Sequence, residues 1–304
     1  MSRLLGLVRD RLCAHYLGNS YVADAFRAAL RIPNFLQNLF GEGVLSASFI
    51  PVYARLRAEE RHEEASEVAE AIFVLLLAVT SILVLLGIFA TPLLIDVIVP
   101  GFRGETRVLA IRLVRIFFPG AALLVLSAWC LGVLNSHRKF LLSYAAPVIW
   151  NAAMIVAYLW DRGRTGEEHL AVVIAMASVV GSGLMFLAQL GPVLRLLRPL
   201  ALRIRLRSGS VKTVIRNFFP VFFSRGVVQV SSFVDSTLAS FLPTGAISAF
   251  TYAQTLNTLP VSLFGMAVSA AELRRCRALW VRQMRSPKSF GNDWRTGFRT
   301  SHSL

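Results

Sequence analysis

The stretch Asn19–Arg57, NSYVADAFRAALRIPNFLQNLFGEGVLSASFIPVYARLR, indicates the class of fold. It is mostly apolar, but Asp24, Arg27, Arg31 and Glu42 lie within its helix-like sequence. Three interruptions follow one another along it: Pro33, the triplet Gly41-Glu42-Gly43, and Pro51. We predict a broken transmembrane helix whose charges and freed backbone groups face a water-filled cavity or other helices, because lipid cannot satisfy them. The alternative is a soluble amphipathic helix with breaks.

The composition favours the membrane interpretation. Hydrophobic residues make up 55% of the chain and charged residues only 16%, and the mean hydropathy is +0.60. A soluble chain has about a quarter charged residues. The net charge of +15 and the pI near 11.0 are typical of nucleic-acid-binding proteins. Basic loops that hold helices against an anionic leaflet explain the excess better, so we expect contacts with membrane lipids and none with nucleic acid.

No pattern of residues predicts bond-making chemistry. Cys13, Cys130 and Cys276 are far apart, the five histidines are scattered, and neither set has metal-ligand spacing. We therefore expect no metal, no cofactor and no enzymatic active site. No nucleotide-binding motif is visible either, so an ion gradient (sodium or protons) or the membrane potential would have to drive any transport.

Hydrophobic runs separated by polar turns predict an all-α, polytopic membrane protein with about eight transmembrane helices. The predicted spans are Met1–Leu17, the broken Asn19–Arg57, Glu67–Val99, Arg107–Leu134, Phe140–Trp160, Leu170–Leu194, Asn217–Leu242 and Ala246–Leu273. They divide into an N-terminal lobe (1–194, six helices), a basic cytoplasmic linker (195–216), the start of a C-terminal lobe (217–273) and a basic tail (274–304). Between the second and third spans we predict a charged helical loop at Arg55–Glu67.

The basic residues predict the orientation of these spans. With the N-terminus inside, the inner loops Arg55–Glu67, Asn135–Lys139 and Arg195–Arg216 carry twelve Lys or Arg. The outer loops Gly18–Ser20, Pro100–Arg107, Asp161–His169 and Pro243–Gly245 carry four. The positive-inside rule therefore predicts a cytoplasmic N-terminus.

Two segments carry a family resemblance: SRLLGLVRD at Ser2–Asp10 and ADAFRAALRIPNFLQNLFGEGVLSASFIPVYA at Ala23–Ala54. The long pattern D-A-F…P-N-x-x…G-E-G-x-x-S-x-x-F-x-P resembles the MurJ/MviN family, and a weaker resemblance continues through Val234–Leu273. That family comprises lipid II flippases of the multidrug/oligosaccharidyl-lipid/polysaccharide exporter superfamily. The resemblance implies a bacterial inner-membrane transporter of peptidoglycan biosynthesis, which works by alternating access between two lobes with fourteen spans in all.

The last residues depart from that pattern. Arg274–Leu304 holds eight Lys or Arg, one acid and no apolar run. Because RRCRAL can be encoded by codons for PAMSRAL read one base late, we expect a frameshift after Leu273, with a natural basic tail as the alternative. The chain as it stands is then expected to be a fragment that does not transport. Its N-terminus is also shorter than is usual in the family.

Charges inside predicted spans are the candidate site, because a mid-membrane charge normally lines a cavity or pairs. The resemblance implies that Arg3 and Arg9 match cavity arginines, Asp10 the first-helix aspartate, and Asp24 and Glu42 further acidic positions. Guanidinium groups suit the pyrophosphate of lipid II, because they bind its oxygens bidentately and stay charged. For Arg3, Arg27 and Arg31, snorkelling to the interface is the alternative.

Two departures weaken the substrate prediction. By the resemblance, Gln37-Asn38 stand where some family members carry arginines, and Tyr252-Ala253-Gln254-Thr255 stands where many carry Y-A-D-R, so Thr255 replaces an arginine. Arg225, or Arg27 with Arg31, are the candidates for compensation. The alternative is another substrate, either a different polyprenyl-linked sugar or a drug.

Asp235 is a weak candidate for sodium binding by the same resemblance, with an Asp–Arg pair inside the bundle as the alternative. A single carboxylate cannot form a sodium site. We expect hinges at Pro33, Gly41, Gly43, Pro119 and Pro260.

Overall fold

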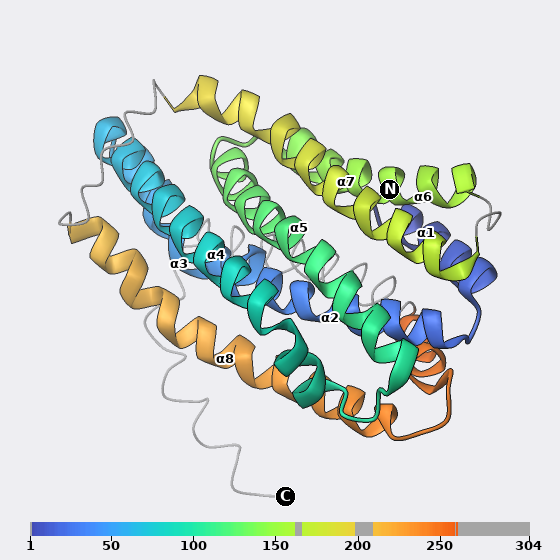
Figure 1. Ribbon diagram of the computed structural model, residues 1–304. Coiled ribbons are helices and arrows are strands. Elements are labelled where there is room, and N and C mark those ends of the chain that lie inside the picture. Colours follow the sequence, from blue (N-terminus) through green and yellow to red (C-terminus); the bar gives the residue numbers. More distant parts are fainter. Residues whose placement is uncertain (1, 162–165, 198–208, 259, 261–304) are drawn as a thin grey trace, which may run out of the picture. The chain divides into compact units, whose positions relative to one another are not determined.

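The computed structural model describes residues 2–161, 166–197, 209–258 and 260. The chain divides into two compact units, 1–250 and 251–304. The first unit contains eight helices in its described part, and no strand occurs there: α1 Ser2–Leu17, α2 Tyr21–Phe40, α3 Glu42–Ala58, α4 His62–Ile98, α5 Gly104–Ser136, α6 Phe140–Asp161, α7 Glu167–Leu196 and α8 Gly209–Ser240 (Figure 1). Residues 246–258 are also helical. The rest of the predicted eighth span and the tail from Arg274 lie outside the described residues.

Four helices have the length and composition of membrane spans. They are α4, α5, α6 and α7, with 37, 33, 22 and 30 residues. About 20 apolar residues suffice to cross the hydrocarbon core of a bilayer. The predicted spans over Glu67–Val99, Arg107–Leu134, Phe140–Trp160 and Leu170–Leu194 are confirmed as helices, and the protein is an all-α, multi-pass membrane protein.

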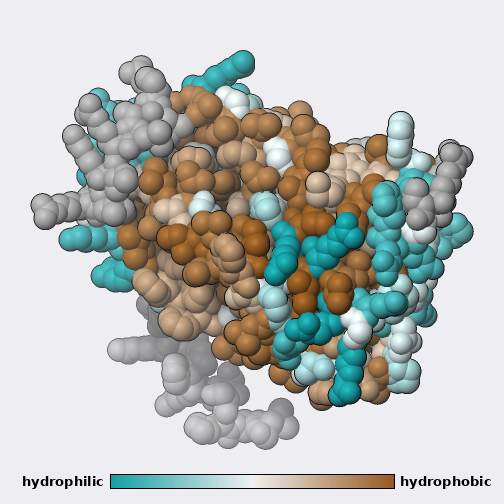
Figure 2. Space-filling view, in the orientation of Figure 1, coloured by the Kyte–Doolittle hydropathy of each residue, from teal (hydrophilic) through white to brown (hydrophobic). Residues whose placement is uncertain are grey.

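The centre of the first unit is α5, which contacts α2, α3, α4 and α7. Its residues are buried almost without interruption from Leu124 to Leu134, and Trp129 donates its indole N–H to the carbonyl of Ala69 in α4 at 3.1 Å. The outward face of α4 exposes apolar side chains, among them Leu85, Leu86 and Phe89. Figure 2 shows hydrophobic residues across the middle of the viewed face and hydrophilic residues gathered mainly on its right side. Exposed apolar side chains of this kind are suited to lipid.

The broken helix is interrupted at one point only within its described residues. The helix continues through residue 33, where we had predicted an interruption, and α3 continues through Pro51. The break lies at Gly41, whose amide still bonds to the carbonyl of Gln37 at 2.7 Å. A Cβ at Gly41 would lie 2.2 Å from that carbonyl oxygen, so glycine is required by close approach. Buried packing of α2 against α5 offsets the cost of about 3 kcal/mol that proline imposes inside a helix.

We predicted that the charged stretch Arg55–Glu67 is a helical loop, and this prediction is wrong. The stretch forms the end of α3 and the start of α4, and only 59–61 connect them. The helix ends bring the charges together: Arg61 pairs with Glu59 and with Glu64. Short local ion pairs allow this sequence to turn without a long loop.

Hydrogen bonds sort the turns into two groups. Tyr21 bonds to Glu168, and the turns after α4 and α8 meet where the amide of Gly101 donates to Ser240 Oγ at 3.2 Å. We call this group the Ser20 end, after the residue that caps α2 beside Tyr21. At the other end, Tyr53 bonds to His137 at 2.9 Å and Arg57 donates to the carbonyl of Ser136. This second group is the His137 end.

Candidate functional site

Two arginines share one carboxylate where α1 and α2 approach. Arg9 Nη2 lies 3.1 Å from Asp10 Oδ1, and Arg27 Nη1 lies 3.4 Å from the same oxygen. The side chains are 19%, 9% and 20% exposed for Arg9, Arg27 and Asp10. Together they carry one net positive charge in partly dry surroundings. Such a group attracts an anion more strongly than the same charges would in water.

Two residues of α6 complete the surroundings of Arg9. Its Nη1 donates to Asn151 Oδ1 at 3.2 Å, and its guanidinium lies 5.0 Å from the centroid of the Trp150 ring. Trp150 in turn donates to Ser178 Oγ in α7 at 3.0 Å, and the amide group of Asn151 donates to the carbonyl of Pro147. Trp150 and Asn151, the two residues that contact Arg9, are therefore each held in place by a further hydrogen bond.

Sequence reasoning did not find Trp150 or Asn151. Asn151 is the only amide side chain in an otherwise apolar span, and it is 5% exposed. A lone amide in such a span is the signal that could have singled it out, because it needs a partner inside the bundle. We name Arg9, Asp10, Arg27, Trp150 and Asn151 the Arg9 cluster.

Asp24 is buried, and its carboxylate accepts hydrogen bonds from the start of the helical segment at 246–258. Its Oδ2 accepts from the amide of Gly245 at 2.6 Å, and its Oδ1 accepts from the amide and hydroxyl of Ser248 at 2.8 and 2.7 Å. Gly245 directly precedes the helix at 246–258 and Ser248 lies in its first turn, where amide donors lack intrahelical partners. Asp24 therefore acts as a helix cap supplied from another element, and both of its oxygens are occupied.

Arg225 lies at the break of the long helix. A Cβ at Gly43 would lie 3.0 Å from the Cζ of Arg225, so the guanidinium covers the first turn of α3. Glu42 is the first residue of α3. Arg3 lies in the first turn of α1. The side chains of Glu42 and Arg3 are not among those described.

The remaining predicted positions are spread over the helices. Asp235 of α8 lies close enough to Arg31 of α2 for their opposite charges to interact, and both ion binding and an Asp–Arg pair stay predictions. Pro119 lies inside α5, and Pro260 is exposed and helical, but its neighbours lie outside the described residues. In the described chain no group of three or more His, Cys, Asp or Glu side chains could hold a metal ion.

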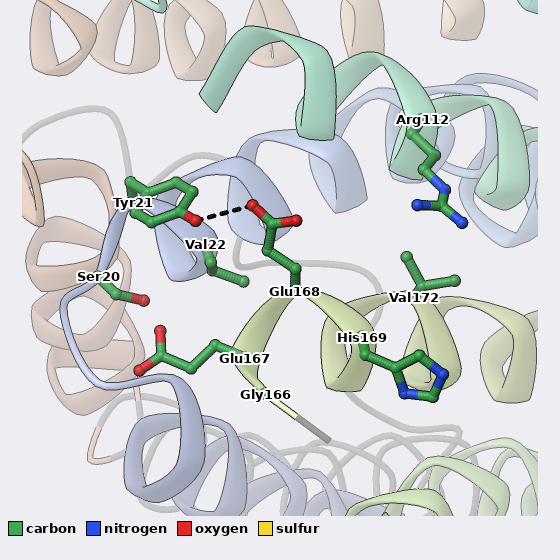
Figure 3. A pocket seen from close by; sticks show the side chains of 9 residues that line it. All are labelled: Ser20, Tyr21, Val22, Arg112, Gly166, Glu167, Glu168, His169 and Val172. Atoms are coloured by element: carbon green, nitrogen blue, oxygen red, sulfur yellow. Dashed lines mark hydrogen bonds between the residues drawn. The ribbon is translucent and has the colours of Figure 1, made fainter. Parts of the chain in front are cut away.

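A separate polar cavity of about 640 Å³ lies at the Ser20 end. The turn before α2, the start of α7 and Arg112 of α5 line it (Figure 3). The hydroxyl of Tyr21 donates to Glu168 Oε1 at 2.7 Å, while Arg112 and His169 lie on the other side of the cavity. Its charged side chains are exposed to solvent, so this cavity differs from the partly buried Arg9 cluster.

The helical arrangement resembles solved transporters. An inward-facing multidrug resistance transporter of the MATE family, from the MOP superfamily, matches with a TM-score of 0.69 at 21% identity, over 86% of this chain and 59% of its own. A structure described as lipid II flippase MurJ in an inward closed conformation matches with a TM-score of 0.72 at 30% identity, over 86% of this chain and 54% of its own. The fold thus defines a multi-pass membrane protein whose helices are arranged like those of these two transporters.

The sequence comparisons identify the family. The family model for lipid II flippase MurJ matches residues 13–277. Lipid II flippase MurJ of Burkholderia cenocepacia is 32% identical over 88% of this chain and 53% of its own length. The probable lipid II flippase MurJ of Bdellovibrio bacteriovorus is 33% identical over 90% of this chain and 52% of its own length. The chain belongs to the lipid II flippase MurJ family, as its sequence resemblance predicted, and it spans about half the length of these relatives.

Proposed function

We propose that this protein takes part in moving lipid II, the lipid-linked peptidoglycan precursor, across the bacterial inner membrane, with its N-terminus in the cytoplasm. The Arg9 cluster is the observation that supports this proposal most directly. It places two guanidinium groups beside one carboxylate between membrane helices. Pyrophosphate is the substrate group that best matches a net positive, partly buried arginine pair.

We assign separate roles to the other predicted residues. Arg225 is a second phosphate contact, because it covers the first turn of α3, where the helix dipole also favours an anion. Asp24 shapes the site by holding the helix at 246–258. Transport proceeds by alternating access without covalent chemistry, so the protein is not an enzyme. A sodium or proton gradient drives it.

The test is lipid II binding to the purified chain in lipid nanodiscs. In a strain depleted of its own MurJ, the chain as it stands is expected not to restore growth, because transport needs both lobes. Arg9→Ala is expected to weaken lipid II binding at least tenfold, since it removes one of the two positive charges proposed to hold the pyrophosphate. Arg9→Lys should rescue only part of the affinity, because a lysine cannot form the bidentate fork. Asn151→Leu should weaken binding about two- to tenfold, because it removes one hydrogen bond worth about 0.5–1.5 kcal/mol.

Trp160→Leu is the matched control, because Trp160 lies on the same helix and is 84% exposed. It should bind lipid II like the unchanged chain. Unaltered lipid II binding by Arg9→Ala would remove Arg9 from the substrate site. Tighter binding of a lipophilic cation than of lipid II would instead favour drug export, which the missing arginines at Gln37-Asn38 and Thr255 also support.

A further inference from the structure

An apolar cavity of about 400 Å³ lies between the second half of the broken helix and two long helices. Phe40, Leu45 and Ser48 line one side of it. The α4 wall comprises Ile72, Leu75, Leu76 and Val79, and the α8 wall comprises Val214, Ile215, Phe218, Phe219 and Phe222. Three of these aromatic rings touch, with centroids 5.4–5.9 Å apart among Phe40, Phe218 and Phe222. A cavity with this lining is suited to a hydrocarbon chain.

The cavity lies inward from the charged helix ends at the His137 end. The His137 end, with the charged turn 59–61 and the start of α8, marks one boundary, because Ser210 Oγ donates to Glu64 Oε1 at 2.6 Å. The α4 wall begins ten residues after the start of that helix at His62, about 15 Å along its axis. Phe219 is 54% exposed, so the α8 wall is continuous with the outer surface of the bundle.

Two basic residues lie beside the end of the cavity that is nearer the charged turns. Lys212 precedes Ile215 by three residues, and Arg216 precedes Phe219 by three, so each lies on the same side of α8 as a lining residue. Both are exposed. Within the described chain neither forms an ion pair, while nearby Glu64 pairs with Arg61 and accepts from Ser210. These positions suit a phosphate at the membrane interface.

We propose that this cavity holds one acyl chain of an anionic phospholipid of the surrounding membrane, with the lipid phosphate at Lys212 and Arg216. The order of charge and apolar lining along α8 favours a phospholipid over a polyprenyl chain. A polyprenyl phosphate bound at Arg225 would have its phosphate about 20 Å deeper than Lys212, and its chain would have to run back toward the charged helix ends. A phospholipid enters head outward and chain inward, as the lining requires.

The test uses the purified chain in bilayers that contain a phosphatidylglycerol with a photoreactive diazirine on its acyl chain. Cross-linked residues are mapped by mass spectrometry. We expect labelling at 72–79 and 214–222 to exceed labelling of the exposed face at 82–89 at least fivefold. Phosphatidylcholine with the same acyl chain should label the cavity several-fold less. Lys212→Gln with Arg216→Gln should remove this difference without changing the cavity walls.

A second pair of variants tests the cavity itself. Val79→Trp fills it and should reduce cavity labelling at least fivefold, whereas Leu86→Trp, on the exposed face of the same helix, should not. Equal labelling by the two phospholipids, or labelling spread evenly over α4 and α8, would show only contact with bulk lipid and overturn the proposal. Stronger labelling by a photoreactive polyprenyl phosphate would assign the cavity to a polyprenyl chain and overturn it too.

Discussion

At the scale of single residues, Asp24 ties α2 to a segment more than two hundred positions later in the chain. Asp24→Asn keeps the shape but replaces one acceptor oxygen by a donor, which faces the amide of Gly245. We expect a loss of about 1–3 kcal/mol in the free energy of unfolding, because a buried donor is left unpaired. Thermal unfolding in detergent measures the loss.

Glu105→Gln is the control for Asp24, since it also removes a carboxylate at the Ser20 end but is exposed. Its effect should stay within about 0.5 kcal/mol. Equal stabilities for the two variants would mean that the hydrogen bonds to Asp24 do not stabilise the fold.

His137 lies in the turn between α5 and α6, and its surroundings oppose protonation. Burial, followed by the nearby charges of Arg57 and Lys139, lowers the pKa of His137 to about 4. In the unfolded chain the ordinary pKa of about 6.5 applies. Above that value the group is neutral in both states. As the pH falls from about 6.5 toward 4 the unfolded state takes up a proton first, so stability is lost.

His137→Gln should flatten the pH dependence of the thermal unfolding temperature between pH 7 and 5. His62→Gln, at an exposed position of the same end, provides the comparison. A slope that is unchanged in His137→Gln would show that another group titrates.

The candidate site shows what a sequence can and cannot predict at this scale. Arg9 and Asp10 were predictable because adjacent charges inside an apolar segment must find partners. Asn151 lies 142 positions from Arg9, and no local pattern connects the two. The substrate role of Asp24 stays a prediction. Its hydrogen bonds from the backbone amides of Gly245 and Ser248 were not predictable, because only the folded chain brings these groups together.

At the scale of elements, the long helix breaks at Gly41, where the backbone leaves no room for a side chain beside the carbonyl of Gln37. Gly41→Ala should force the break to shift, and we expect it to destabilise the protein by about 1–3 kcal/mol. Gly226→Ala is the matched control within a helix, since its Cβ would meet nothing nearer than 3.9 Å. The control should be neutral or more stable, by up to about 1 kcal/mol.

Thermal unfolding compares these two variants. If Gly41→Ala were as stable as Gly226→Ala, the break would tolerate a side chain and the close approach would not matter.

Lengths and types of the helices were largely predictable from hydrophobic runs. Gly41 was one of three predicted interruptions, but the sequence could not single it out, because Pro33 and Pro51 are stronger local signals and packing against α5 overrides them.

At the scale of the whole molecule, the two groups of turns allow the orientation to be tested. Single cysteines at Arg103→Cys, near the Ser20 end, and Lys139→Cys, at the His137 end, are introduced into a chain with Cys13, Cys130 and Cys276 replaced by alanine. A membrane-impermeant maleimide added to intact spheroplasts should label position 103 and not position 139. Both should react after the membrane is permeabilised. The reverse pattern would contradict a cytoplasmic N-terminus and the positive-inside count behind it.

The hydrogen bonds at the Ser20 end also affect how fast the helices joined there can separate. Besides the bonds to Asp24, Thr237 donates to the carbonyl of Ile98 at 2.8 Å, and Gly101 donates to Ser240. Any motion that parts α8 and the helix at 246–258 from α2 and α4 must break these contacts before new ones form. Each kcal/mol by which they stabilise the joined state slows that parting about fivefold. Stronger hydrogen bonds at this end would make the folded protein more stable but would slow the separation of these helices.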